Sequence, residues 1–196
     1  DPEQASRPFS LDRKGIVLSE GAGVLVLAAE EAISSRGLTP RAEVMGIGWT
    51  SDAHHFTLPN AATIVNAIKE ALDDAGLTPG DIGYVNAHGT STQKGDRVEV
   101  ECLREVFGPK LATIPVSSNK SQIGHTLGAS AAIEAALGIE AMQRGLLLPT
   151  VNHVPDPELA DVDVVPHNAR RQKYEFFLSN SFGFGGTNCC VIFRGV

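Results

Sequence analysis

Two histidines and a lysine, each placed just beyond an apolar run, are the residues of this sequence best suited to acid-base chemistry. His88 follows the run Ile82–Asn86, and the later run "TIPVSS" is followed by Lys120 and His125. Loops at the carboxyl ends of parallel strands share one edge of the sheet, where ligands collect, so we expect these side chains to converge. An imidazole there could transfer a proton or bind a carbonyl oxygen. A histidine packed beneath a turn is the competing interpretation of His88.

The segment after His125 is rich in small residues and carries a single acidic side chain, Glu134. Small residues from 128 to 132 let a helix approach a neighbouring backbone closely and bury what it carries. A buried Glu134 would need a cation, and Lys120 is the candidate. The alternative leaves Lys120 and Glu134 on the surface and makes His125 an N-terminal helix residue.

A third loop, "NSFGFGGTNCC", has the glycines of a phosphate cradle but not its context. Phosphate loops lead from a strand into a helix, whereas the strand-like "CCVIF" follows here. The glycines are better suited to bring backbone N–H groups to a reacting carbonyl, as in an oxyanion hole. Phe182 and Phe184 would wall or gate that pocket, and the alternative, especially for Phe184, is a phenylalanine in the core.

Alternating strand and helix patterns must position these loops. We expect strands at residues 16–27, 42–51, 82–88 and 113–118, a terminal hairpin, and helices at 61–76, about 96–107 and through 144. A further short helix ends at Gly37. Residues 52–60 and the proline-rich stretch after Gly145 are expected to be loops. This order predicts an α/β fold with parallel strands and helices on the sheet faces.

Composition narrows the class of protein. The formal charge of −7 and the lack of a Lys and Arg cluster argue against a nucleic-acid surface. The nearest basic group, Arg170, Arg171 and Lys173, is expected to be a solvated loop that could meet an acidic partner. No apolar run reaches the ~20 residues that span a bilayer, so we expect a cytoplasmic protein that does not enter a membrane.

The cysteines are expected to be free thiols. Cys189 and Cys190 are adjacent, and Cα atoms ~3.8 Å apart are closer than the ~4.4 Å that disulfides require. Cys102 lies in a helical pattern and is expected in the core, which fits a reducing compartment. A cysteine-histidine hydrolase using Cys189 or Cys190 is an alternative from another class of enzyme.

The three loops together, "VNAHGTST", "SSNKSQIGHTLGASAAIEA" and "NSFGFGGTN", resemble the C-terminal half of the KAS II-type β-ketoacyl-acyl carrier protein synthases and of polyketide ketosynthases. The resemblance extends to "ASRPFSLDRKGIVLSEGAGVLVL" near the start. It implies an α/β, thiolase-like fold, whose C-terminal half is a five-stranded mixed sheet with helices on both faces. Residues 1–41 would be the last strand and helix of the N-terminal half, and residues 42–196 the C-terminal domain.

The resemblance also implies an activity, decarboxylative Claisen condensation of an acyl group with malonyl-acyl carrier protein to give a 3-oxoacyl product. His88 and His125 would be the catalytic pair, with Lys120 beside them and Glu134 as its carboxylate. Thr90 and Thr92 would hold the phosphopantetheine arm, and Phe182 would be the gate whose backbone N–H belongs to the oxyanion hole. It implies no metal and no cofactor other than that arm, with acyl carrier protein as partner and a homodimer as assembly.

The family's nucleophilic cysteine belongs to the N-terminal half and has no counterpart here. Cys102 lies in a different motif, and we expect no condensing activity from these 196 residues alone. Three explanations remain: a fragment, which the abrupt start at Asp1 favours, a separate subunit completed by an N-terminal partner chain, or a non-catalytic binding or chain-length-determining subunit of a heterodimer. The joint presence of the two histidines, the lysine and the glutamate argues against the last.

Overall fold

The computed structural model describes the backbone of residues 1–196 and all side chains except that of Pro2. The strands are β1 (Ala42–Ser51), β2 (Ile82–Asn86), β3 (Val116–Ser117), β4 (Leu146–Leu147), β5 (Arg170–Arg171), β6 (Phe176–Gly183) and β7 (Thr187–Gly195). The α-helices are α1 (Glu30–Arg36), α2 (Ala61–Ala75), α3 (Gln93–Phe107), α4 (Lys120–Ile123) and α5 (Ser130–Gln143). The 3-10 turns are η1 (Pro2–Gln4), η2 (Pro79–Asp81), η3 (Gly108–Thr113), η4 (Leu127–Ala129) and η5 (Pro157–Leu159).

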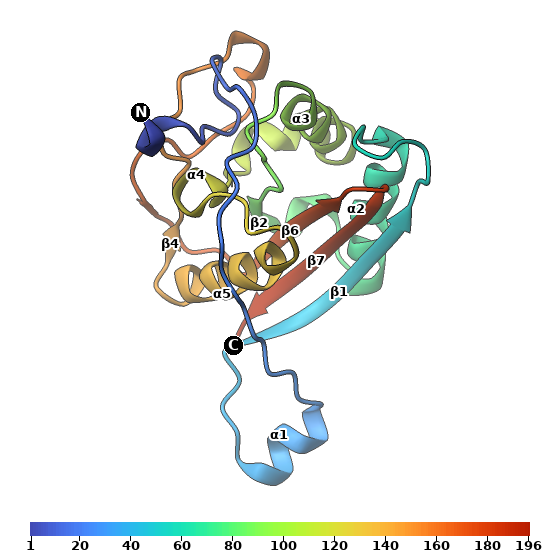
Figure 1. Ribbon diagram of the computed structural model, residues 1–196. Coiled ribbons are helices and arrows are strands. Elements are labelled where there is room, and N and C mark those ends of the chain that lie inside the picture. Colours follow the sequence, from blue (N-terminus) through green and yellow to red (C-terminus); the bar gives the residue numbers. More distant parts are fainter.

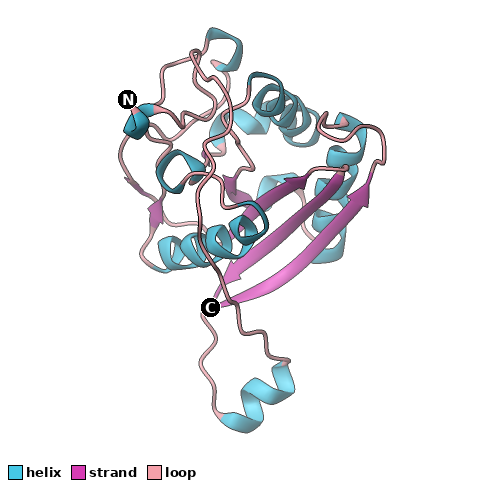
Figure 2. Ribbon diagram, viewed as in Figure 1, coloured by secondary structure: helices cyan, strands magenta, loops and turns pink.

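One mixed sheet forms the centre of the fold (Figures 1 and 2). Its strand order is β1-β7-β6-β2-β3. β6, β2 and β3 run parallel, whereas β7 lies antiparallel to both β6 and β1. The predicted terminal hairpin is β6 and β7, and the small sheet of β4 and β5 lies within the stretch predicted as a loop. The mixed α/β architecture is therefore confirmed.

Helices cover both faces of the sheet. One core lies between the sheet and the helices α2 and α3, and the other lies between the sheet and α5. Gly46 and Gly48 of β1 let α2 approach, since a Cβ at Gly48 would lie 1.8 Å from the carbonyl oxygen of Ala67. On the opposite face, a Cβ at Gly138 of α5 would lie 2.8 Å from the ring of Phe177.

The predicted strand at residues 16–27 is not formed, and this expectation was wrong for the described chain. The segment is extended, but its strand-like pairing is an isolated bridge between Leu18 and His125. No neighbouring strand lies beside the remainder, and Val24 and Val26 are 86% and 91% exposed. The segment leads to α1, which stands apart from the body of the protein (Figure 1) and ends at Gly37 as predicted.

Residues before this segment behave differently, because they pack into the main core. Phe9 is fully buried among residues of that core, and Arg13 is 4% exposed. These first residues are thus packed against the body of the protein, and the chain extends away from it only in the segment 16–27 that leads to α1.

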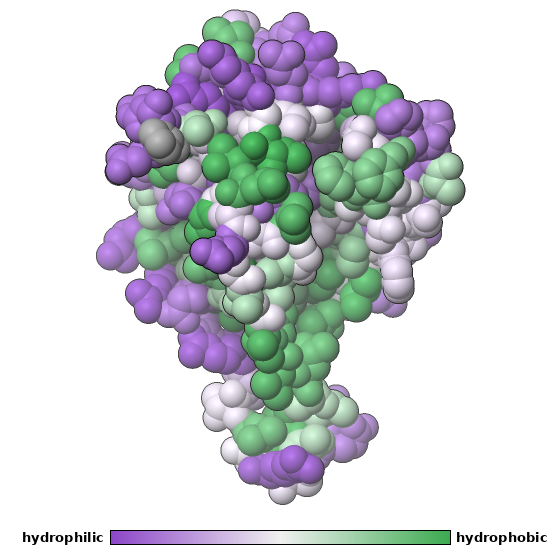
Figure 3. Space-filling view, in the orientation of Figure 1, coloured by the Kyte–Doolittle hydropathy of each residue, from purple (hydrophilic) through white to green (hydrophobic). Residues whose placement is uncertain are grey.

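Apolar surface gathers around the extended segment. Figure 3 shows a hydrophobic band along the narrow connection between the body and α1. The exposed apolar side chains of this segment and of the nearby η4 and α5 include Leu18, Val24, Val26, Leu27, Leu127 and Leu137. Separately, none of the helices in the described residues is long and apolar enough to cross a membrane.

Candidate active site

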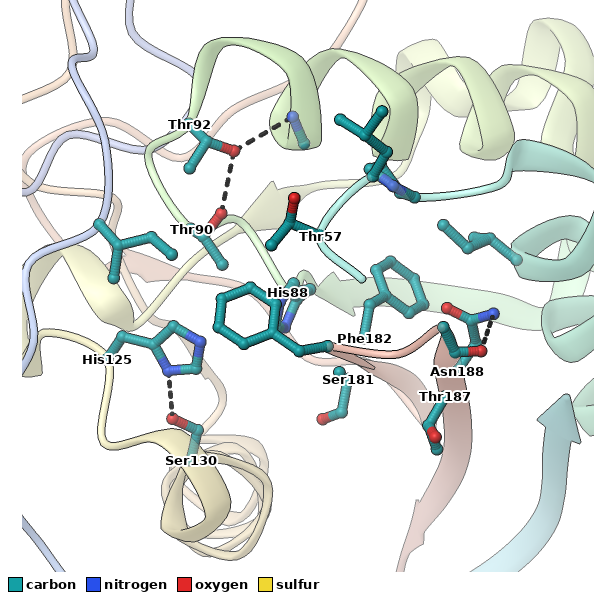
Figure 4. A pocket seen from close by; sticks show the side chains of 18 of the residues that line it. Thr57, His88, Thr90, Thr92, His125, Ser130, Ser181, Phe182, Thr187 and Asn188 are labelled. Carbon is teal, nitrogen blue, oxygen red and sulfur yellow. Dashed lines mark hydrogen bonds between the residues drawn. The ribbon is translucent and has the colours of Figure 1, made fainter. Parts of the chain in front are cut away.

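A cavity of about 670 Å³ opens where β2 and β6 end, beside the start of α5. Figure 4 shows His88, Thr90, Thr92, His125 and Phe182 around it. These five predicted site residues all line the cavity, whereas Lys120 and Glu134 do not. The sequence therefore predicted which loops converge, and the structure separates the residues at the cavity wall from a pair beneath it.

His88 is held by its backbone rather than by its ring. The N–H groups of His88 and Gly89 each donate to a carboxylate oxygen of Glu99, both at 2.8 Å. Glu99 lies on the buried face of α3 and also accepts from the amide of Asn180 at 3.1 Å. Within the described residues the His88 Nδ1 atom is buried without a hydrogen-bond partner. The turn after β2 is therefore fixed while the imidazole remains available to a ligand.

His125 lies in the loop between α4 and α5. Its N–H donates to Val17 O at 2.7 Å, and its carbonyl accepts from Ser19 N–H at 3.1 Å, so the extended segment positions it. The ring Nδ1 accepts from the N–H of Leu127 at 3.1 Å and lies 3.0 Å from Ser130 Oγ. Because a backbone N–H can only donate, Nδ1 is an acceptor and the neutral ring carries its proton on Nε2.

The two imidazoles face each other edge to face, with ring centroids 5.5 Å apart. Burial, with smaller contributions from Lys120 and His125, holds the pKa of His88 well below its usual range. Burial and the charge of Lys120 lower the pKa of His125 to about 4. Both rings are therefore neutral at pH 7. In this form each imidazole keeps one N–H, which can donate a hydrogen bond to a developing oxyanion.

Lys120 and Glu134 form a buried ion pair beneath the cavity. Lys120 is 1% exposed and Glu134 is fully buried, and the ammonium donates directly to Glu134 Oε1. Burial raises the pKa of Glu134, and Lys120 opposes that shift. Lys120 is the first residue of α4 rather than part of an irregular loop. The predicted pairing is therefore present, and the surface alternative for these two residues is wrong.

Thr90 and Thr92 line the other side of the cavity. Their Oγ1 atoms lie 3.2 Å apart, and Thr92 Oγ1 accepts the N–H of Gly95 at 3.1 Å. Thr92 therefore caps the N-terminus of α3, a role the sequence analysis did not assign. Its hydroxyl proton can still be donated toward the cavity.

The two phenylalanines of the glycine-rich turn occupy different positions. The Phe182 ring lies 5.3 Å from the His88 ring, close to the imidazoles. Phe184 is 58% exposed and packs on Phe56 with ring centroids 5.5 Å apart, so the core alternative for Phe184 is wrong. The N–H of Gly185 already donates to the Phe56 carbonyl, which removes it as an oxyanion donor in this conformation.

The thiols are not activated. Cys189 lines the cavity, but burial raises its pKa, and burial raises the pKa of Cys190 far more. Cys102 is buried in the main core, and its pKa is raised to about 12 by burial. A nucleophilic cysteine needs a lowered pKa, so these environments disfavour the hydrolase alternative.

Sequence reasoning missed Glu99 and Ser130. Glu99 falls on the same helical stripe as Val100, Leu103 and Phe107, so an acidic residue on an apolar face was the available signal. Ser130, the residue beside His125 Nδ1, is one of several small residues at the start of α5, and its type alone gives no such signal.

The five-stranded mixed sheet with helices on both faces has a thiolase-like fold, as in solved ketosynthase structures. The family model for the beta-ketoacyl synthase C-terminal domain matches residues 41–154. The chain belongs to the beta-ketoacyl synthase family and corresponds to the C-terminal half of its members.

Similar proteins agree with this assignment. 3-Oxoacyl-[acyl-carrier-protein] synthase 2 of Staphylococcus aureus is 43% identical over 197 residues, covering 99% of this chain and 49% of that protein. The ishigamide ketosynthase/chain length factor is 38% identical with a TM-score of 0.92, over 98% of this chain and 47% of that one. A type II polyketide ketosynthase solved with its acyl-carrier protein, AntDE:AntF, is 34% identical with a TM-score of 0.93, over 99% and 48%. The chain spans about half the length of these relatives.

Proposed function

We propose that this chain is the histidine-bearing half of a condensing enzyme that joins an acyl group to malonyl-acyl carrier protein. The acyl group is held as a thioester on a cysteine of the other half. Loss of CO₂ from the malonyl group leaves its electron pair as an enolate, which attacks the acyl carbonyl. The cysteine thiolate departs, and a 3-oxoacyl thioester remains on the carrier protein. No metal or further cofactor is needed for this balance.

The facing pair of neutral imidazoles in a cavity is the observation that carries this proposal. Decarboxylation places negative charge on the malonyl thioester oxygen, and two fixed N–H donors would stabilise it. His125 presents Nε2–H as donor because its Nδ1 is occupied. The Nδ1 atom of His88 has no hydrogen-bond partner among the described residues, so the ring is free to turn a donor toward the oxyanion.

The remaining predicted residues take supporting roles. Lys120 would keep the local field positive without touching substrate, and Glu134 would prevent it from being an unpaired buried charge. Thr90 and Thr92 would donate to the phosphopantetheine arm. Phe182 would be the gate and supply the oxyanion N–H by resemblance. The exposed Phe184, between Gly183 and Gly185, is a second candidate for the gate.

The proposed partners are acyl carrier protein and a cysteine-bearing half, which is an N-terminal segment or a separate chain. The apolar character of α5 supports a covering layer, because "SAAIEAALGIEAM" is apolar or small on nearly all sides while part of the helix is exposed. Residues 1–41 would belong to that half and residues 42–196 to the C-terminal domain. In this division Phe9 of the first part would pack in the main core of the second. The full enzyme would be a homodimer that binds neither nucleic acid nor a membrane.

The test measures CO₂ release from malonyl-acyl carrier protein by the enzyme that carries this chain and the cysteine-bearing half. His88→Ala and His125→Ala should each lower the rate by about 100-fold, since alanine has no side-chain N–H and one oxyanion donor contributes about 3 kcal/mol. His54→Ala is the matched control. His54 is exposed and does not line the cavity, so this variant should keep the wild-type rate. Equal rates in all three variants would reject the proposal.

A chain-length-determining subunit is the second candidate, because one similar structure is a ketosynthase/chain length factor. In that case the histidine variants would leave CO₂ release unchanged but alter product length. The chain alone should form no acyl thioester and no 3-oxoacyl product, and either activity from purified chain would contradict the missing-cysteine interpretation.

A further inference from the structure

Arg13 is buried and bridges the leading segment, the Thr92 loop and the turn at Asp156. Its Nε donates to the carbonyl of Thr92 and its Nη2 to that of Gln93, both at 3.1 Å. Its Nη1 donates to Asp156 Oδ2 at 2.8 Å and to Ser10 O at 2.7 Å. The guanidinium is thus bonded on three sides, and two of its partners are backbone carbonyls of the loop that begins α3.

Asp96 holds the same loop from its other side. It is fully buried, and its Oδ1 accepts the N–H of Thr92 at 3.3 Å while its Oδ2 accepts the N–H of Phe9 at 2.8 Å. Asp96 Oδ2 lies 3.8 Å from Arg13 Nε. Both backbone polar groups of Thr92 are therefore fixed by this pair, its N–H by Asp96 and its carbonyl by Arg13.

We infer that Arg13, together with Asp96, is a positioning residue that holds the Thr90–Thr92 loop in register to bind the arm of the substrate. This inference rests on the proposed function. Arg13 touches no cavity surface, so it would act through the backbone of Thr92. A small displacement of the loop would shift the hydroxyls of Thr90 and Thr92 relative to the two imidazoles, and errors of about 1 Å in such positioning are costly.

Only the guanidinium fork satisfies this arrangement. Its N–H donors point in fixed directions within one plane. They reach four acceptors at once, which are three backbone carbonyls and the carboxylate of Asp156. A lysine ammonium could keep the ion pair with Asp156 but could not also reach both carbonyls. Arg13→Lys therefore keeps the positive charge at this position but removes the hydrogen bonds to both carbonyls.

The test compares two malonyl thioesters in the enzyme that carries this chain and its cysteine-bearing half. Malonyl-pantetheine retains the arm, whereas malonyl-N-acetylcysteamine lacks most of it. Arg13→Lys should raise the KM for malonyl-pantetheine about tenfold while kcat stays within about twofold, and it should leave the KM for the truncated thioester unchanged. A general loss of folded protein would instead lower the apparent kcat for both substrates equally.

Arg97→Gln is the matched control. Arg97 lies in the first turns of α3 and pairs with Glu158 on the surface. Like Arg13, it links the start of α3 to the turn that follows Asp156, but it does not contact Thr92. This variant should keep both KM values. If Arg13→Lys folds poorly, Asp156→Asn, which removes the counter-charge but keeps the arginine, should raise the KM for malonyl-pantetheine two- to threefold.

An unchanged KM for malonyl-pantetheine in folded Arg13→Lys or Asp156→Asn, or an equal rise for both thioesters, would overturn the inference. Wild-type enzyme that condenses neither thioester nor malonyl-acyl carrier protein would instead reject the proposed function, so the two failures are distinguishable.

Discussion

Replacing Glu134 by glutamine should destabilise the protein by leaving Lys120 as a buried, uncompensated cation. Breaking a buried ion pair by removing one partner costs about 3–5 kcal/mol. We therefore expect a loss of about 3–5 kcal/mol in the free energy of unfolding.

The assay is equilibrium urea unfolding at pH 7. The double variant Lys120→Met/Glu134→Leu should recover most of the loss, because an apolar pair of similar size replaces the ions.

Glu140→Gln is the control on the same helix, since Glu140 pairs with Arg41 on the surface. This change should leave the unfolding curve where it is. The reasoning fails if Glu134→Gln loses less than about 1 kcal/mol at pH 7, or if the double variant is no more stable than Glu134→Gln.

Three other predictions follow from the packing and the pKa values. Gly138→Ala should lose about 1–3 kcal/mol in urea unfolding because its Cβ would meet the Phe177 ring, whereas Gly128→Ala, with no atom within 4 Å, should not. The low pKa of His125, about 4, predicts that CO₂ release persists from pH 7 to pH 5 and fails only as that ring gains its proton. A midpoint near pH 6.5 in the pH-rate profile would contradict this. Cys189, whose pKa is raised by burial, should be alkylated at pH 7 more slowly than a free cysteine peptide, as followed by mass spectrometry.

The sequence predicted the elements with strong periodicity and the convergence of His88, Lys120 and His125, because strand ends in a parallel sheet share an edge. It failed at residues 16–27, where an apolar segment interrupted by glycines predicted a strand. A β-strand requires a neighbour as well as a pattern, and none lies beside this segment in the described chain. The local pattern could not reveal that a partner was missing.

The supporting residues were harder to predict for a different reason. Arg13 and Asp96 act through backbone groups of a loop far along the chain, and such contacts leave no spacing in the sequence. The ion pair of Lys120 and Glu134 was predictable because a glutamate among small, buried residues needs a cation. The capping role of Thr92 was missed because the predicted helix begins at about residue 96, whereas α3 begins at Gln93, directly after Thr92.

The anchoring of the leading segment also has a kinetic consequence. Arg13 lies 143 positions before its partner Asp156, so this contact cannot form until all the intervening residues have been synthesised. Contacts of such long range close slowly, because the intervening chain must first be ordered. Phe9 and its neighbours should therefore remain exposed late in folding, and the positioning of the Thr92 loop should be among the last events. Refolding of the protein is expected to show a slow final phase, in which newly made chains are most prone to aggregate.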